Sequence, residues 1–267
     1  MSDNVVIGVS ASPSTRPSSV IRDTVALIGR SLRLTRRNLD SLFTGLLLPV
    51  LLMLLFVYIL GGAIQTGTSY VTYVVPGVLL LCAGFVAANT AVTVNHDMTG
   101  GVIDRFRSMD INGAAFLASH VTASVIRDIL STAIVFTVAL LIGFRADASP
   151  LEWLGAAGIL LLFIGAISWL GAALGLLTKS PEAAGNVTFV MVFLPYPSSA
   201  FVPIKTMPFW IQGFANNQPV TPVIDTVRGL LLHTPLGSSP WYAIAWCVSI
   251  MLVSVLFASI LFRRRSA

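Results

Sequence analysis

The residues that could make or break bonds are few in this chain and widely spaced. It has three histidines, at positions 96, 120 and 233, and two cysteines, at positions 82 and 247. Histidine and cysteine act as nucleophiles, acid–base catalysts or metal ligands when several of them converge. The histidines are scattered, and both cysteines fall inside long apolar runs, where a thiol acts as a small apolar filler. The sequence therefore predicts no catalytic residue, no metal ligand and no bound cofactor.

Nucleotide hydrolysis by this chain is not expected either. A phosphate-binding loop has the form G-x-x-x-x-G-K-[ST]. The nearest fragment, GLLTKS at 175–180, has Thr178 where the second glycine should stand. If ATP drives this protein, ATP and Mg²⁺ must be bound by a separate chain.

The strongest charged pattern is the stretch GGVIDRFRSMDIN at residues 100–112, where four of thirteen positions are charged in a chain with 10% charged residues. On a helical wheel one face holds Val102, Ile103, Phe106 and Met109, and the other holds Asp104, Arg105, Arg107 and Ser108. The stretch is too short and too charged to cross a membrane. It predicts a helix at the membrane surface that docks into another protein through Phe106 and Met109. A solvated loop with accidental periodicity is the alternative.

Long apolar runs surround this stretch. The 267 residues are 55% hydrophobic, with a mean hydropathy of +0.87, and soluble domains carry about 25% charged residues against the 10% here. Six runs approach the ~20 residues that cross a bilayer. They lie at about 43–64, 71–93, 122–144, 152–177, 183–202 and 241–262. Because backbone in lipid must satisfy its own hydrogen bonds, the sequence predicts an all-α polytopic membrane protein with six transmembrane helices.

The basic residues predict the orientation. With six crossings both termini share one side, and thirteen of the sixteen basic residues fall on that side, which is therefore cytoplasmic. These residues flank apolar runs, so no nucleic-acid binding is expected. Residues 1–17 are predicted to be a disordered tail. Residues 18–40 form an amphipathic interfacial helix or a charged lead-in, and residues 41–265 form the transmembrane domain.

Prolines interrupt the chain before the last run. They stand at Pro195, Pro197, Pro203, Pro208, Pro219 and Pro222. Proline removes a backbone donor, so the fifth span should end early and short helical pieces should follow. The stretch Met207–Phe214, with Trp210 inside it, could dip into the membrane as a re-entrant outer segment; an ordered loop is the alternative. Asp225 and Arg228, three positions apart, are expected to pair.

The cores of the six predicted spans hold no convincing ionisable residue, because Arg127 and Asp128 are expected close to the inner face. An ion- or proton-coupled secondary transporter of small amphiphiles would need acidic or histidine groups at the bilayer midplane. It is therefore the second-ranked prediction. A membrane enzyme is disfavoured by the scattered histidines.

Two stretches resemble the type 2 ABC exporter permeases, in the daunorubicin-resistance-like branch of drug and lipid exporters. HDMTGGVIDRFRSMDI (96–111) resembles the family's cytoplasmic coupling segment, and SSAFVPIKTMPFWIQGFANNQPVTPVIDTVRGLL (198–231) resembles its signature before the last span. The resemblance covers roughly residues 20–265. This chain departs at Asp110 and Gly113, where family members often have a proline and a basic residue.

The resemblance implies a non-catalytic permease subunit that exports amphipathic drugs, lipids or glycolipids across the bacterial cytoplasmic membrane. Its implied partners are two separate ATPase subunits, which bind ATP and Mg²⁺, a second permease chain, identical or paralogous, and membrane lipid. The charged stretch, together with Asp97, would pass the ATPase motion to the spans.

The resemblance also implies roles for residues elsewhere in the chain. The second and fifth spans would line the transport path with Asn89, Thr90, Thr93, Asn186, Phe189 and Phe193, and packing between helices is the alternative for each. A re-entrant segment that caps the outer end would contain Pro203, Met207, Pro208, Trp210, Pro219, Pro222 and Arg228.

Overall fold

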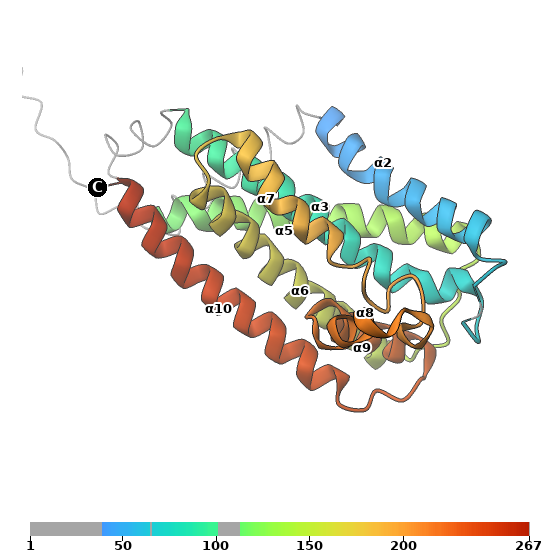
Figure 1. Ribbon diagram of the computed structural model, residues 1–267. Coiled ribbons are helices and arrows are strands. Elements are labelled where there is room, and N and C mark those ends of the chain that lie inside the picture. Colours follow the sequence, from blue (N-terminus) through green and yellow to red (C-terminus); the bar gives the residue numbers. More distant parts are fainter. Residues whose placement is uncertain (1–38, 65, 101–112, 267) are drawn as a thin grey trace, which may run out of the picture.

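The computed structural model describes residues 39–64, 66–100 and 113–266, which contain helices and no strand (Figure 1). The elements are α2 (Leu39–Leu55) with the π-helical turn η1 (Phe56–Leu60), α3 (Tyr70–Thr99), α5 (Gly113–Leu141), α6 (Pro150–Leu177), α7 (Pro181–Phe193), the 3-10 turn η2 (Ile204–Thr206), α8 (Phe209–Asn217), α9 (Val220–Leu232) and α10 (Ser239–Ser266). The predicted all-α fold is confirmed for this part of the chain. The tail 1–17, nearly all of the predicted helix 18–40 and the charged residues 101–112 lie outside the described residues.

Four of the described helices are long and apolar enough to cross a bilayer, namely α3, α5, α6 and α10. Residues Leu46–Leu60 of α2 and η1 form a shorter apolar helix. The 13 residues of α7 extend about 20 Å at 1.5 Å per residue, less than the ~30 Å of a hydrocarbon core. The six predicted runs thus correspond to four spanning helices, one shorter helix and one helix that ends early.

Two spanning helices extend further than the sequence predicted. α3 continues to Thr99, beyond the predicted end at 93, and α5 begins at Gly113, ahead of the predicted start at 122. Phe116, Leu117 and Val121 pack in a second apolar core with residues of α3, α6 and α10. Hydropathy alone missed these turns because polar residues interrupt them, although their apolar face is buried.

The central helix is α3. It contacts α2, α5, α6, α7 and α9. Its most apolar stretch is 83% buried inside the protein, compared with 28% for α5 and 17% for α10. The apolar stretch of α3 is therefore mostly surrounded by protein, whereas that of α10 is mostly exposed on the surface of the bundle. Because lipid tails are as apolar as leucine, helices in a membrane associate through close packing and polar contacts.

Small residues build the contact between α3 and α6. Gly171 and Gly175 lie so close to α3 that a Cβ atom on either would collide with the carbonyl oxygen of Ala87 or Ala91. Two glycines four positions apart are the small-xxx-small pattern that lets helix backbones approach in a membrane. The backbones of α3 and α6 are thus in direct contact.

Asn95 strengthens the same contact with hydrogen bonds. Its side chain is fully buried, and Nδ2 donates to the carbonyl oxygens of Gly175 at 3.0 Å and Thr178 at 2.6 Å. Thr178 is the residue that follows α6, so its carbonyl has no acceptor role inside the helix. Asn95, on the neighbouring helix α3, therefore supplies hydrogen bonds to carbonyl groups at the end of α6.

Side-chain hydrogen bonds hold the chain between α7 and α9 in place. This chain is called here the proline-broken segment (residues 194–219). α7 ends at Phe193, as the following prolines predict. Backbone that leaves a helix at membrane depth is tolerated only where protein satisfies its polar groups. The Tyr70 hydroxyl donates to the Phe201 carbonyl (2.9 Å), and the Thr221 hydroxyl donates to the Ala215 carbonyl (2.6 Å). Within the segment, Gln218 Nε2 donates to the Pro197 carbonyl (2.6 Å), and the Ser198 hydroxyl donates to the Pro195 carbonyl. The segment is therefore ordered by contacts with α3 and α9.

Replacement of Gly171 by valine is expected to destabilise the protein, because the added side chain meets the α3 backbone, which cannot move aside. Overpacking of this kind costs about 1–3 kcal/mol. A thiol-reactive dye can follow thermal unfolding, since Cys82 and Cys247 are both buried in the fold. The control is Gly165→Ala on the same helix, where a Cβ would meet nothing within 4 Å. Equal unfolding midpoints for the two variants would contradict the close α3–α6 contact.

Candidate functional site

One face of the bundle, formed by α3 and α7, exposes polar and aromatic side chains; it is called here the α3–α7 face. Its exposed residues are Asn89, Thr93, Asn186, Phe189 and Phe193. The two helices run antiparallel, with Gly84 of α3 beside Val192 of α7 and Gly185 of α7 beside Val92 of α3. This register brings Asn89 and Asn186 to nearly the same depth.

Contact with lipid would be unfavourable for the exposed side-chain amides of Asn89 and Asn186. Asn89 lies about 15 Å along the axis of α3 from its last residue. In the described part of the chain, the side-chain amides of Asn89 and Asn186 make no hydrogen bond with one another or with a neighbour. A polar group left unpaired in hydrocarbon costs several kcal/mol. The α3–α7 face therefore has to be covered by protein or water.

Thr90 is the one predicted path residue that this face does not include. It is fully buried, and its Oγ1 atom lies 2.7 Å from the Ser124 hydroxyl, which in turn lies 3.0 Å from the Ser168 hydroxyl. Arg127 also donates from Nη2 to Thr90 Oγ1, at 3.2 Å. Thr90 thus joins α3 to α5 and α6, which corresponds to the helix-packing alternative.

Five aromatic rings, called here the aromatic ladder, continue from the α3–α7 face to Phe56 at the start of η1. The centroid distances are 4.4 Å for Phe189–Phe193, 5.3 Å for Phe193–Tyr196, 5.2 Å for Tyr196–Phe201 and 4.3 Å for Phe201–Phe56. Such pairs each add about 0.5–1.5 kcal/mol beyond the apolar area they bury. Phe189 is exposed and Phe201 is buried, so the ladder leads from the open face into the core.

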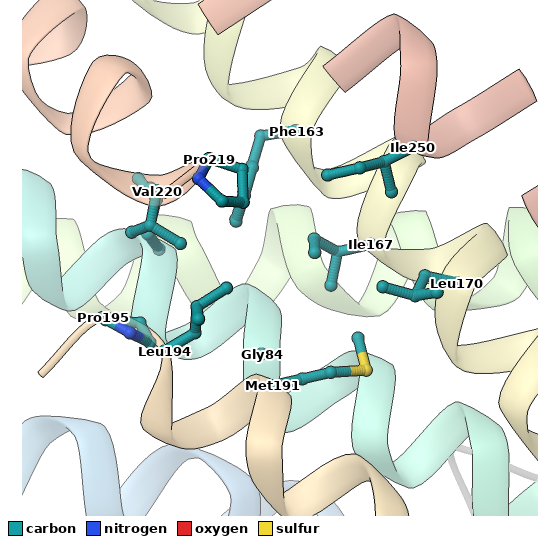
Figure 2. Close-up of a pocket in the computed structure, with 11 residues that line it drawn as sticks. Gly84, Phe163, Ile167, Leu170, Met191, Leu194, Pro195, Pro219, Val220 and Ile250 are labelled. Carbon is teal, nitrogen blue, oxygen red and sulfur yellow. The ribbon is translucent and has the colours of Figure 1, made fainter. Parts of the chain in front are cut away.

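A small apolar cavity lies where α7 ends and α9 begins (Figure 2). Leu194 and Pro195 line one side, Pro219 and Val220 line another, and side chains of α3, α6 and α10 complete the wall. Its volume is about 90 Å³, well below the roughly 300–1,000 Å³ of drug-sized ligand pockets. The α3–α7 face is therefore a better candidate site for a large ligand than this cavity.

Arg228 ties α9 to the start of α3 and to the proline-broken segment. Its Nη2 atom donates to the carbonyl oxygens of Tyr73 at 3.1 Å and Ser199 at 2.6 Å, and Nη1 donates to Asp225 at 3.1 Å. The guanidinium carbon also lies 3.8 Å from the centroid of the Tyr73 ring, a cation–π contact. The predicted pairing of Asp225 with Arg228 is confirmed, and the arginine of this pair is buried.

The carboxyl group of Asp225, which pairs with Arg228, is also partly buried. Burial raises the pKa of the Asp225 carboxyl above the ordinary range of an aspartate, and the hydrogen bond from Ser199 and the charge of Arg228 oppose that rise. The Ser199 hydroxyl donates to Asp225 Oδ1 at 2.6 Å. Asp225, Ser199 and Arg228 therefore act as one polar cluster.

The other residues predicted for the re-entrant outer segment stand at helix starts and turns. Pro208 and Pro219 immediately precede α8 and α9, and Pro222 lies in the first turn of α9, where a missing donor is harmless. Pro203 and Met207 flank η2. Trp210, at the start of α8, is 79% exposed. The chain from Phe209 to Leu232 is thus mostly helical, in α8 and α9, and α9 is mostly buried.

At the opposite end of the bundle, Asp97 meets His120. Asp97 Oδ2 lies 3.3 Å from His120 Nε2, and the buried His120 ring packs edge-on against Phe116. This contact joins the end of α3 to the start of α5, the two helices that flank the charged stretch. The other predicted docking residues, at 102–109, lie outside the described residues.

The prediction that the spans hold no ionisable core residue is wrong. Asp128 is 1% exposed and lies near the middle of α5. The prediction placed Asp128 near the inner face because it started this span at 122. Since α5 begins at Gly113, the same position becomes central. A lone acidic residue inside an apolar run was the signal available in the sequence.

Comparison with known proteins connects these features to one family. Residues 22–232 match the ABC-2 type transporter family. DrrB1 of Streptomyces coeruleorubidus, named a daunorubicin resistance ABC transporter permease protein, is 30% identical over 248 residues, or 92% of this chain and 87% of that protein. DrrC of Mycobacterium tuberculosis, named a probable doxorubicin resistance ABC transporter permease protein, is 25% identical over 251 residues, or 92% of this chain and 90% of that protein.

Replacement of Arg228 by alanine is expected to destabilise the end of the bundle that holds α9. Two carbonyl oxygens and the partly buried Asp225 would lose their donor, and a buried polar group left without its hydrogen-bond partner costs about 1–3 kcal/mol. Thermal unfolding followed by thiol labelling should show a lower midpoint, and Asp225→Asn in the same background should restore part of it. Lys205→Ala, at an exposed position of η2, is the control. An Arg228→Ala midpoint equal to that of the control would refute the role of this cluster.

Proposed function

The chain belongs to the ABC-2 type transporter family, and from that membership we propose that it is the permease subunit of an exporter of amphipathic drugs, lipids or glycolipids. Members of this family are the non-catalytic transmembrane component of ABC transporters, so ATPase partner subunits are implied. ATP and Mg²⁺ are bound by two such subunits, outside this chain. The observation that carries the proposal is the α3–α7 face, which exposes unpaired amides within the membrane.

A second permease chain, identical or paralogous, covers the α3–α7 face. In an isologous dimer the same surface of each chain meets its counterpart across a two-fold axis. The path then runs between the two chains and is lined from each side by Asn89, Thr93, Asn186, Phe189 and Phe193. Thr90 is left out because it is buried. The small size of the apolar cavity supports a path shared between chains.

The aromatic ladder supports a cargo with a large apolar or aromatic part. Exposed Phe189 and Phe193 offer ring faces on which such a part can stack, and the amides of Asn89 and Asn186 offer hydrogen bonds to its polar groups. Two relatives carry names that refer to daunorubicin and doxorubicin resistance. Those names are consistent with export of amphipathic drugs.

The proposed topology has six crossings with both termini in the cytoplasm of a bacterial cell. α2 with η1, and α7 with the turns that follow it, supply the two crossings beyond the four long helices. α8 and α9 form the re-entrant cap on the outer side. The exposure of Phe209 and Trp210 on α8 supports its placement at a membrane interface, where aromatic side chains are enriched.

The charged stretch 101–112 is the coupling helix, in which Phe106 and Met109 are the apolar anchors for the ATPase subunit. The pair formed by Asp97 and His120 joins the helices on both sides of this stretch. A displacement of the coupling helix therefore reaches α3 and α5 together, and Asn95 passes it to α6. Alternating access to the path follows from this motion.

An ion-coupled secondary transporter of small amphiphiles is the second candidate function. One observation favours it, namely the buried carboxyl of Asp128 near the middle of α5. The two functions differ in their energy source. The secondary transporter works without an ATPase partner, whereas the proposed exporter stops when ATP hydrolysis is blocked.

Export by membrane vesicles that contain this chain and its ATPase partner is expected to require ATP and to stop with vanadate. Phe106→Ala and Arg105→Ala should lower export at least tenfold while the ATPase subunits still hydrolyse ATP, because the contact that transmits the motion is lost. Lys205→Ala, an exposed residue at the other end of the bundle, should leave export unchanged. Vanadate-insensitive export would refute the ATP-driven mechanism, and normal export in both coupling variants would refute the role of the coupling helix.

The position of the second permease can be tested by cross-linking. The native thiols, Cys82 and Cys247, are both buried, so a single introduced cysteine dominates the reaction with a thiol cross-linker. Phe193→Cys on the α3–α7 face should give covalent dimers if two copies of this chain pair, or a cross-link to a paralogous permease with a matching cysteine. Leu256→Cys, 64% exposed on α10, is the control and should give none. Cross-links from position 256 but not from 193 would place the partner on another face.

A further inference from the structure

We propose that Asp128 is a proton-binding site at the centre of the bundle, and that the permease takes up and releases one proton there during its conformational cycle. The binding site stands on the geometry of this chain alone, whereas its part in the cycle rests on the proposed transport function. The ligand is a proton, bound at the side-chain carboxyl of Asp128.

The position of Asp128 is that of a core residue. It lies on the buried stripe of α5 with Ser124, Ser131 and Val135, and only 1% of its surface is exposed. The Thr132 hydroxyl lies 3.5 Å from Oδ1, which is long for a hydrogen bond. The buried Oδ2 atom has no hydrogen-bond partner in the described part of the chain. One carboxyl oxygen is thus left in an apolar interior without a donor.

Two ionisable neighbours act on Asp128. The thiol of Cys82 faces it from α3, and the positive charge of Arg127, at the preceding position of α5, only partly offsets the cost of its burial. Arg127 also extends its Nη2 atom to Thr90 of α3. The side chains of α2 that the structure describes, at 46–55, include no ionisable group, and the charged Glu152 of α6 and Arg264 of α10 stand near the ends of their helices.

A bare carboxylate in such a place is costly. Transfer of an ionised carboxylate out of water without hydrogen bonds costs far more than transfer of the neutral acid, so a buried carboxyl relieves the cost by binding a proton. The neutral acid also gains a donor hydrogen of its own. In the arrangement of the structure, Asp128 therefore holds a proton on its carboxyl group.

The proton leaves when the contact between α5 and its neighbours opens. Water that reaches Asp128 accepts the proton, the carboxyl becomes a carboxylate and the water becomes hydronium, so atoms and charge balance. Arg127, one position away, then stabilises the new negative charge. When the helices close again, the carboxylate recovers a proton from water. Low pH favours the closed arrangement because this arrangement binds one more proton, and high pH favours the open one.

Infrared spectroscopy of the full chain in lipid nanodiscs tests the site directly. A protonated carboxyl absorbs as a C=O stretch that is separate from the carboxylate bands. At neutral pH the wild-type protein should show this band, and Asp128→Asn, which keeps the shape of the side chain, should lose it. Asp128→Glu should keep a protonated band at a shifted position. This second variant distinguishes loss of the carboxyl group from misfolding caused by the first substitution.

The matched control is Glu182→Gln, which removes an exposed carboxylate at the start of α7. The pKa of Glu182 is lowered by hydrogen bonds from its own backbone and from Ser180, so this variant should leave the protonated band unchanged. Identical spectra of wild type and Asp128→Asn in the protonated region at neutral pH would overturn the proposal.

The functional arm of the test measures ATP-driven export as a function of pH. Wild-type export should change with pH, and Asp128→Asn should flatten that dependence while export itself continues. A pH profile of Asp128→Asn equal to that of wild type would overturn the role in the cycle. Failure of ATP-driven export in the wild type would instead refute the proposed function, while the infrared result would still decide whether Asp128 binds a proton.

Discussion

The contact between α3 and α6 is the interaction on which the rest of the bundle depends. Within lipid a helix gains little by hiding leucine side chains, so helices hold together where backbones approach closely and polar groups find partners. Gly171 and Gly175 provide the close approach, and Asn95 provides the hydrogen bonds at the end of α6. The other helices are then arranged around α3.

Polar contacts attach these other elements to α3 along its length. Thr90 connects it to Ser124 of α5, and the carbonyl oxygen of Tyr73 accepts from Arg228 of α9. At its far end Asp97 reaches His120. The 30 residues of α3 extend about 45 Å as one helix. One continuous helix, with Pro76 inside it, therefore joins the end near the charged stretch to the end that holds α9.

The same constraint explains three polar side chains that have unpaired atoms in the described part of the chain. Asn89 and Asn186 are exposed on the α3–α7 face, so an additional molecule can satisfy them, and in the proposed dimer that molecule is a second permease with a water-filled path between the chains. Asp128 is enclosed, so no large partner can reach it and a proton is the smallest way to remove its charge. Exposure and burial of polar groups at membrane depth thus lead to different functional proposals.

The sequence by itself determined the features that depend on local chemistry. Long apolar runs predicted a helical membrane protein, Pro195 predicted the early end of α7, and the spacing of Asp225 and Arg228 predicted their pairing. The charged stretch at 96–111 and the proline-rich stretch at 198–231 were enough to indicate the ABC exporter family. Each of these signals is a continuous stretch of sequence, so residues far away in the chain were not needed to interpret it.

Only the tertiary structure decided which face of each helix is buried. Asn89 and Thr90 are adjacent and both polar, yet the first is exposed and the second is bonded to α5, because α3 presents them to different neighbours. Asp128 became a central residue only when packing against α6 and α10 extended α5 back to Gly113. Burial depends on contacts between helices far apart in the sequence, and hydropathy along one helix does not contain that information.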